Sequence, residues 1–260
     1  MLDRLKALWD TEKAIPASAA SASKAPREDD GLPFGLRVGS LVDTSTLVMP
    51  RPDSLVPAKP LSPAEVVAVS VVDFQMSGTL HRFYFETGDT PENPETYLQV
   101  YSDAQGRVQE VWYFERLLRM FPGSEQELGL FLGETPGEGL GAREFSLWRN
   151  QLAELGYADA RLDRVFGQEE GRAYLRADGR DDDYVSPMQG EEERIDDGQG
   201  TQGLNQRIVC MPYNCELAVG REQLWIQTEV VRSQNNSVVQ AARVDFMIGV
   251  DVAIEDVKTL

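Results

Sequence analysis

Short apolar segments alternate with polar turns along most of the chain, a pattern typical of antiparallel β structure. β-branched and aromatic residues dominate the stretches 66–72, 81–86, 96–101 and 107–114, which therefore predict strands. The polar stretch 102–106 separates the last two of these segments and predicts a hairpin turn.

The same pattern returns in the last third of the chain. Strands are predicted at 207–211, 224–232 and 238–250, and the polar stretch 233–237 predicts a turn between the last two. The stretch 50–63 contains five prolines and cannot continue a central strand, so short strands and turns are expected there.

Two helices are predicted between these β-rich parts. The first spans 124–132, with Ser124 as its N-cap and Glu127 three residues later. The second spans 145–155. Its four large apolar residues share one helical face and are expected to pack in the core: Phe145, Trp148, Leu152 and Leu155.

The first 28 residues differ in character from the rest. Four apolar residues lie on one stripe of a short predicted helix: Leu2, Leu5, Leu8 and Trp9. We expect this stripe to dock onto a protein partner or a membrane surface; the alternative is a frayed terminus with a chance stripe. The small residues of 16–26 predict a flexible linker to the body.

Together these elements predict an α+β fold with mostly antiparallel strands. Two or three central helices would separate small barrel-like or sandwich-like halves. The predicted parts are an arm at 1–28, a β-rich part at 29–123, and a part at 124–260 that combines helices, an acidic loop at about 178–203 and C-terminal antiparallel strands.

Charge and composition narrow the possible partners. The formal net charge of −18 disfavours nucleic acid, whose affinity depends on Lys and Arg. Two cysteines in 260 residues are typical of a reducing compartment, and the N-terminus lacks an apolar stretch of signal-peptide length. We therefore expect a cytoplasmic protein, peripheral at the inner membrane if the arm binds lipid.

The acidic character is strongest at 178–197, where nine acidic residues face two arginines. Large apolar groups are scarce there, so the stretch predicts a mobile, solvated loop. Calcium binding by these carboxylates is the alternative, although the spacing of an EF-hand loop is missing.

No catalytic or cofactor motif emerges. The single histidine, His81, lies in a predicted strand and is expected to be structural. Cys210 and Cys215 lack the spacing of zinc or redox pairs and predict partly buried thiols flanking a turn. Gly137–Ala142 formally matches a dinucleotide fingerprint, but no strand precedes it and Glu138 would repel a pyrophosphate. We predict no cofactor and no metal.

Three stretches together resemble the YjfK-like family of bacterial proteins: Gly31–Gly39, Thr96–Val100 and the block Arg207–Val250. The resemblance spans most of 31–260. The family has no established activity, so the resemblance implies no catalytic residues. It implies a genomic context shared with a PspA-like membrane-remodelling protein and an ATP-grasp amide ligase. The acidic stretch and the proline-rich stretch depart from the family pattern.

These observations favour a non-enzymatic binding or adaptor protein of a membrane-associated or envelope-stress system, with a PspA-like partner or a membrane surface bound by the arm. The alternative is an enzyme, or enzyme subunit, acting on a cationic amine or peptide that the negative body attracts. A pocket joining His81 to several carboxylates would favour the enzyme.

Overall fold

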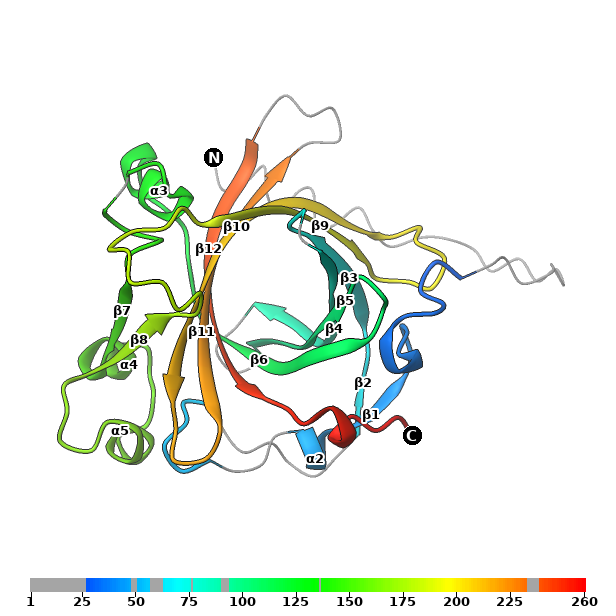
Figure 1. Cartoon of the computed structure of the whole chain (residues 1–260), viewed down its shortest axis with the longest axis horizontal. Helices are drawn as coiled ribbons and strands as arrows, with labels where there is room; N and C mark the ends of the chain where they lie inside the picture. Colours follow the sequence, from blue (N-terminus) through cyan, green and yellow to red (C-terminus); the bar gives the residue numbers. More distant parts are fainter. Residues whose placement is uncertain are drawn as a thin grey trace, which may run out of the picture.

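The computed structural model describes residues 27–47, 51–56, 63–75, 77–89, 94–135, 137–232 and 239–260. Its largest feature is a barrel of antiparallel strands, seen end-on in Figure 1. The barrel strands are β3 (Ala68–Asp73), β4 (Gly78–Asp89), β5 (Pro94–Asp103), β6 (Val108–Met120), β9 (Met188–Ile195), β10 (Gly203–Glu216), β11 (Arg221–Arg232) and β12 (Val239–Asp251). They are hydrogen-bonded in the order β11-β12-β6-β5-β4-β3-β9-β10, and β10 pairs back with β11 to close the ring.

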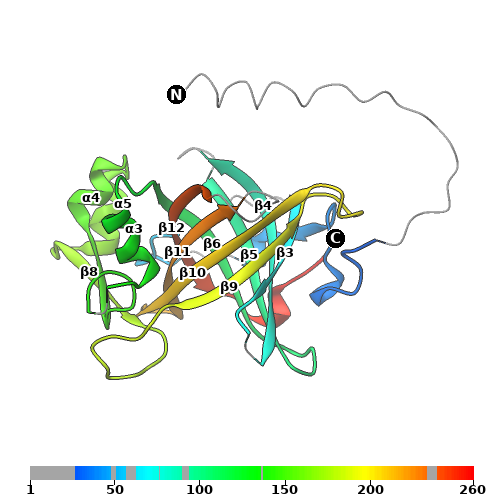
Figure 2. The ribbon, with the colours of Figure 1, turned by 90° about the horizontal axis from the view of Figure 1, so that it is seen from above.

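Shorter elements lie outside the barrel. On one side stand β7 (Glu144–Trp148), β8 (Gly171–Arg176), α3 (Glu125–Leu132), α4 (Arg149–Glu154) and α5 (Asp159–Phe166), as Figures 1 and 2 show. β8 joins this group to the barrel by pairing with the end of β10. The remaining elements are η1 (Pro33–Gly35), β1 (Leu41–Asp43), α2 (Thr44–Leu47), β2 (Pro63–Glu65) and η2 (Ile254–Asp256).

The strands alternate between a face that lines the barrel interior, the lumen, and a face that points outward. Contacts between strands that are not neighbours identify the inner face. Arg82 on β4 donates to the side chain of Gln227 on β11 (2.9 Å), although three other strands lie between β4 and β11 on either side of the ring. The Arg82 side chain therefore crosses the lumen, and Leu80 and Tyr84 share its face of β4.

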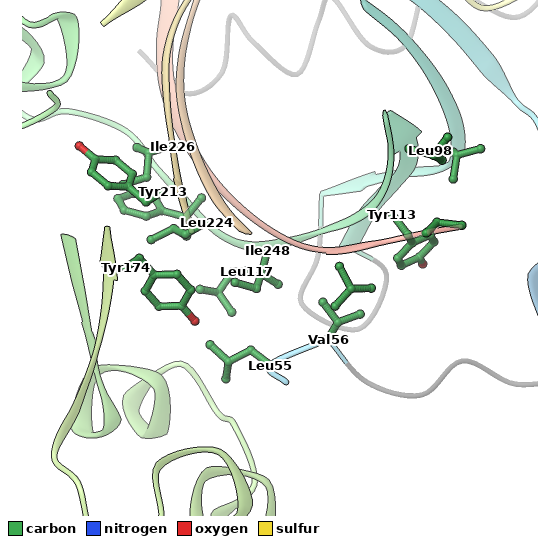
Figure 3. Close-up of a cluster of buried hydrophobic side chains, with 14 of the residues drawn as sticks. Leu55, Val56, Leu98, Tyr113, Leu117, Tyr174, Tyr213, Leu224, Ile226 and Ile248 are labelled. Carbon is green, nitrogen blue, oxygen red and sulfur yellow. The ribbon is translucent and has the colours of Figure 1, made fainter. Parts of the chain in front are cut away.

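The main apolar core lies outside the lumen, between the barrel wall and the elements that cover it. Figure 3 shows part of it, with side chains of β5, β6, β11 and β12 meeting those of the covering segments. Leu55 and Val56 pack there and are almost fully buried. Glu222, also buried, fixes this segment because its carboxylate accepts from the Ser54 hydroxyl and the Leu55 amide, both at 2.6 Å.

The predicted α+β fold with central helices is wrong. The chain is mostly β, and strands from both the 29–123 part and the 124–260 part build a single closed barrel rather than two halves. The described helices are short and lie outside the barrel (Figure 1). Closure depends on the pairing of β3 with β9 and of β10 with β11, which local sequence patterns do not reveal.

The structure confirms the first of the two predicted central helices and contradicts part of the second. The first is confirmed as α3, whose N-cap Ser124 accepts a hydrogen bond from the Glu127 amide at 3.1 Å. The second is wrong in its first half, because Glu144–Trp148 forms β7 paired with β8 and only Arg149–Glu154 is helical. Phe145 still packs in the core, with its ring 5.8 Å from that of Phe246.

The acidic stretch is not a mobile loop throughout. Its second half, Met188–Ile195, is strand β9 and pairs with β3 on one side and β10 on the other. Alternation points Glu192 into the lumen and leaves Glu191 and Glu193 outside, where both are exposed. Gly190 permits this close packing because a Cβ there would lie 2.7 Å from the Phe74 ring.

Candidate functional site in the barrel lumen

The middle of the lumen holds a buried ion pair. Arg82 is fully buried, and its guanidinium lies 3.3 Å from the carboxylate of Glu192, which is 1% exposed. The same guanidinium donates to the side-chain oxygens of Gln99 (3.1 Å) and Gln227 (2.9 Å). It also lies 4.9 Å from the centre of the Tyr97 ring, so four side chains from three strands fix its position.

Glu192 is equally well held. Its carboxylate accepts hydrogen bonds from Ser70 (2.6 Å), Tyr84 (2.6 Å) and Gln206 (2.9 Å). Burial acts to raise the pKa of Glu192, but the charge of Arg82 and these donors outweigh it, so the pKa lies below its ordinary value. The Arg82–Glu192 pair is therefore ionised and held in place across the middle of the lumen.

One end of the lumen carries further buried charges. Arg119 forms a bidentate ion pair with Asp245, with both N–O distances at 2.6 Å, and Arg243 pairs with Glu229. Glu95 lies beside them. Burial, together with the charges of Glu229 and Asp245, raises the pKa of Glu95 to about 7. This end can therefore exchange a proton near neutral pH.

The other end of the lumen is hollow. It is the end where β3 and β5 finish and β4 and β6 begin, and it contains a pocket of about 500 Å³. Four aromatic side chains line the pocket: Phe74, Tyr101, Trp112 and Trp225. Aliphatic groups such as Leu80 and Met188 complete most of its wall. We call this space the mouth pocket.

The mouth pocket contains few polar groups. Gln99, whose oxygen accepts from Arg82, lines it and links it to the central ion pair. Three further polar residues line the pocket near the starts of β6 and β11: Gln109, Glu110 and Gln223. The buried indole nitrogen of Trp225 has no hydrogen-bond partner within the described part of the chain. A buried donor of this kind is costly unless an acceptor pairs with it, which a bound ligand can do.

The residues singled out from the sequence lie elsewhere. His81 is on the outer face of β4, stacked on Phe83 at 6.4 Å, and burial lowers its pKa. It does not line the mouth pocket, so the arrangement that would favour an enzyme is absent from this pocket. Gly137–Ala142 lies after α3 with positive φ at Gly139, where a Cβ would collide with the Leu130 carbonyl.

The cysteine prediction is wrong in its geometry. Cys210 and Cys215 do not flank a turn but lie within one strand, β10. Both are free thiols; Cys210 packs with the lumen aromatics, whereas Cys215 packs against the outer core. Burial raises the pKa of both thiols. The predicted docking stripe, Leu2, Leu5, Leu8 and Trp9, lies outside the described residues, so docking by the arm stays a prediction.

Sequence reasoning missed the lumen residues altogether. Arg82, Glu192 and Glu95 look like solvent-facing charges of strands, since a charged residue is usually exposed. The signal that could have found them is strand parity. In β5, Glu95 and Gln99 share a face with Tyr97, and a polar face that also carries aromatic rings is typical of a barrel interior rather than a solvated surface.

Residues 11–258 match the model of a family described as a protein of unknown function (DUF2491). The chain belongs to this family. Comparisons with curated proteins and with solved structures give no match.

The described residues of this family member contain no cluster of three or more His, Cys, Asp or Glu side chains that could hold a metal ion. Among the same residues, no helix has the length and apolar character needed to cross a membrane.

Proposed function

We propose that this DUF2491 member is a binding protein that holds a small, largely apolar molecule in the mouth pocket. The observation that carries the proposal is the pocket itself, about 500 Å³ in volume and lined mostly by aromatic and aliphatic side chains. Ligand pockets typically measure ~300–1,000 Å³ and combine apolar walls with a few oriented polar groups.

The floor of the pocket is preorganised for binding. Gln99 is held by Arg82, and Arg82 is held by Glu192, so the lumen cannot collapse inward to fill the space. The Trp225 ring is fixed by Phe114, at 6.2 Å between centroids, and by Phe74, at 6.3 Å. A rigid pocket loses little conformational entropy on binding, which favours affinity.

The finer family assignment and the cellular role belong to the same proposal. The stretches Gly31–Gly39, Thr96–Val100 and Arg207–Val250 support a YjfK-like member, a name compatible with the family match. A ligand-binding body also suits the adaptor role expected from the sequence. In that role the arm at 1–28 docks on a PspA-like partner or a membrane surface, while the barrel binds its ligand.

A neutral dye tests the pocket. N-phenyl-1-naphthylamine fluoresces strongly in apolar surroundings, and we expect saturable binding to the full chain with one site. Replacing Leu80, which lines the pocket, by Trp fills the space and should weaken binding by about tenfold or more. Val71→Trp is the matched control, because Val71 lies on β3 opposite the lumen face and is 39% exposed.

Both variants need thermal unfolding curves close to that of the wild-type protein for the comparison to hold. Loss of dye binding in Leu80→Trp alone supports the proposal. Equal binding by Leu80→Trp and the wild-type protein would place the dye elsewhere and would reject the mouth pocket as the ligand site.

A further inference from the structure

The geometry points to an organic cation as the ligand of the mouth pocket: an amine or quaternary ammonium group attached to an apolar body. This inference rests on the proposed function and adds the ligand's charge to it. It follows from the one carboxylate in the pocket, the arrangement of its aromatic rings, and the charge of the chain.

Glu110 is the only charged side chain among the described residues that line the pocket. It lies on β6, two residues before Trp112, so the two side chains share a face of the strand. The indole nitrogen of Trp112 is 3.5 Å from the Glu110 carboxylate, at the limit of a hydrogen bond. A positive group above Trp112 would therefore meet both a ring face and a carboxylate.

The aromatic rings of the pocket already attract positive groups. The Arg221 guanidinium lies 5.1 Å from the centre of the Trp112 ring, and that of Arg82 lies 5.8 Å from the Trp225 ring. Trp rings bind cations best among side chains, and aromatic cages are a common way to recognise quaternary ammonium groups. Arg221 does not line the pocket, but its contact with the Trp112 ring places a competing positive charge beside the pocket.

The rest of the chain strengthens this preference. The formal net charge of −18 attracts cations to the surface and raises their local concentration. An anionic ligand would have to approach through this field and sit beside Glu110. Arg221 and the amides of Gln99 and Gln223 are the groups that would favour an anion, so the sign of the ligand's charge must be measured directly.

Three ligands of one shape separate charge from apolar contact: 1-adamantanamine, 1-adamantanol and 1-adamantanecarboxylate. Each is titrated against the complex of the full chain with N-phenyl-1-naphthylamine. We expect the amine to displace the dye at about fivefold lower concentration than the alcohol, since an exposed charge pair contributes up to ~1 kcal/mol. The carboxylate should be the weakest of the three.

Two variants test the residues. Glu110→Gln keeps the size of the side chain and should reduce the preference for the amine over the alcohol to less than about twofold. Glu154→Gln, at the exposed end of α4, removes one charge elsewhere and should leave the preference unchanged. Arg221→Met removes the competing cation and should strengthen binding of the amine more than that of the alcohol.

The outcomes separate the two proposals. If the dye binds in the mouth pocket but all three ligands displace it equally, the pocket stands and the cation inference fails. Tighter binding of the carboxylate overturns the inference in favour of an anion. If neither the dye nor the three ligands bind, the proposed function fails as well. An amine preference that survives Glu110→Gln unchanged removes Glu110 from the site and overturns its assigned role.

Discussion

The two faces of the barrel wall are built from the same strands but from different chemistry. On β11, Trp225, Gln227 and Glu229 point into the lumen, whereas Leu224 and Ile226 point outward into the apolar core. The outer face is stabilised by burial of apolar area, which needs no precise partners. The inner face combines rings with charges that must each be paired.

This difference between the two faces shows which part of the fold has room for a binding site. Because the main apolar core lies outside the barrel, the lumen does not have to be filled with aliphatic side chains. It can hold a fixed polar network at its centre and a pocket at one end. Buried ion pairs contribute little net stability compared with apolar packing, so the main effect of the Arg82–Glu192 pair is on the shape of the lumen.

The largest loss of stability is expected from a substitution at the centre of the inner face. Arg82→Met leaves Glu192 buried without its counterion, and loss of one partner of a buried pair costs about 3–5 kcal/mol. Urea unfolding at pH 7 measures the change in free energy of unfolding. The double variant Arg82→Met/Glu192→Gln should recover at least about half of the loss, because no uncompensated charge remains.

An exposed pair provides the control for this experiment. Arg37 and Asp30 lie 3.4 Å apart, but both side chains are more than half exposed. Arg37→Met should therefore change the free energy of unfolding by less than about 1 kcal/mol. Equal effects of the two single variants would contradict the view that burial makes the central pair sensitive.

Sequence patterns predicted the strands well but not the barrel. The content of β-branched and aromatic residues located β3 to β6 and β10 to β12. The barrel closes only through β9. The residues Glu191–Glu193 of this strand are three consecutive charges, without the alternation of apolar and polar residues that is typical of a strand. Only the structure shows that one of these three glutamates is buried against an arginine of β4.

The mouth pocket was equally hidden from sequence reasoning. Trp112 and Trp225 come from strands more than a hundred residues apart, and their meeting depends on the ring order of all eight strands. Trp148, by contrast, was expected in the core and is 45% exposed, because the helix assumed for it begins after it. Local periodicity sets the face of a side chain only where the element type is right.

An intermediate effect is expected from the outer face. Leu55 is fully buried against the outer side of the barrel (Figure 3), and Leu55→Ala should cost about 3 kcal/mol through lost contacts and a cavity. Val219→Ala is the control, because Val219 is 68% exposed and should cost less than about 0.5 kcal/mol. Dye binding in the mouth pocket should be the same in both variants at temperatures where each is folded. Loss of dye affinity in Leu55→Ala would show that the two faces are not independent.

A smaller effect, measured near pH 6, should come from Glu95, at the end of the lumen away from the mouth pocket. Its folded pKa of about 7 lies above the ordinary value of 4.5, so between these pH values the folded protein binds more protons than the unfolded chain. Wild-type stability should therefore fall as the pH rises from about 4.5 to about 7, and level off above it. The full shift corresponds to about 3 kcal/mol, of which about half is expressed near pH 6.

Glu95→Gln removes this titration while keeping the size of the side chain. The variant should match the wild-type protein at pH 4.5 and become more stable than it as the pH rises, with the difference complete near pH 8. Urea unfolding at half-unit pH steps measures the difference. A constant difference from pH 4.5 to 8 would show that Arg119 and Arg243 neutralise Glu95 fully, and the charged end of the lumen would then be a fixed network like the central ion pair.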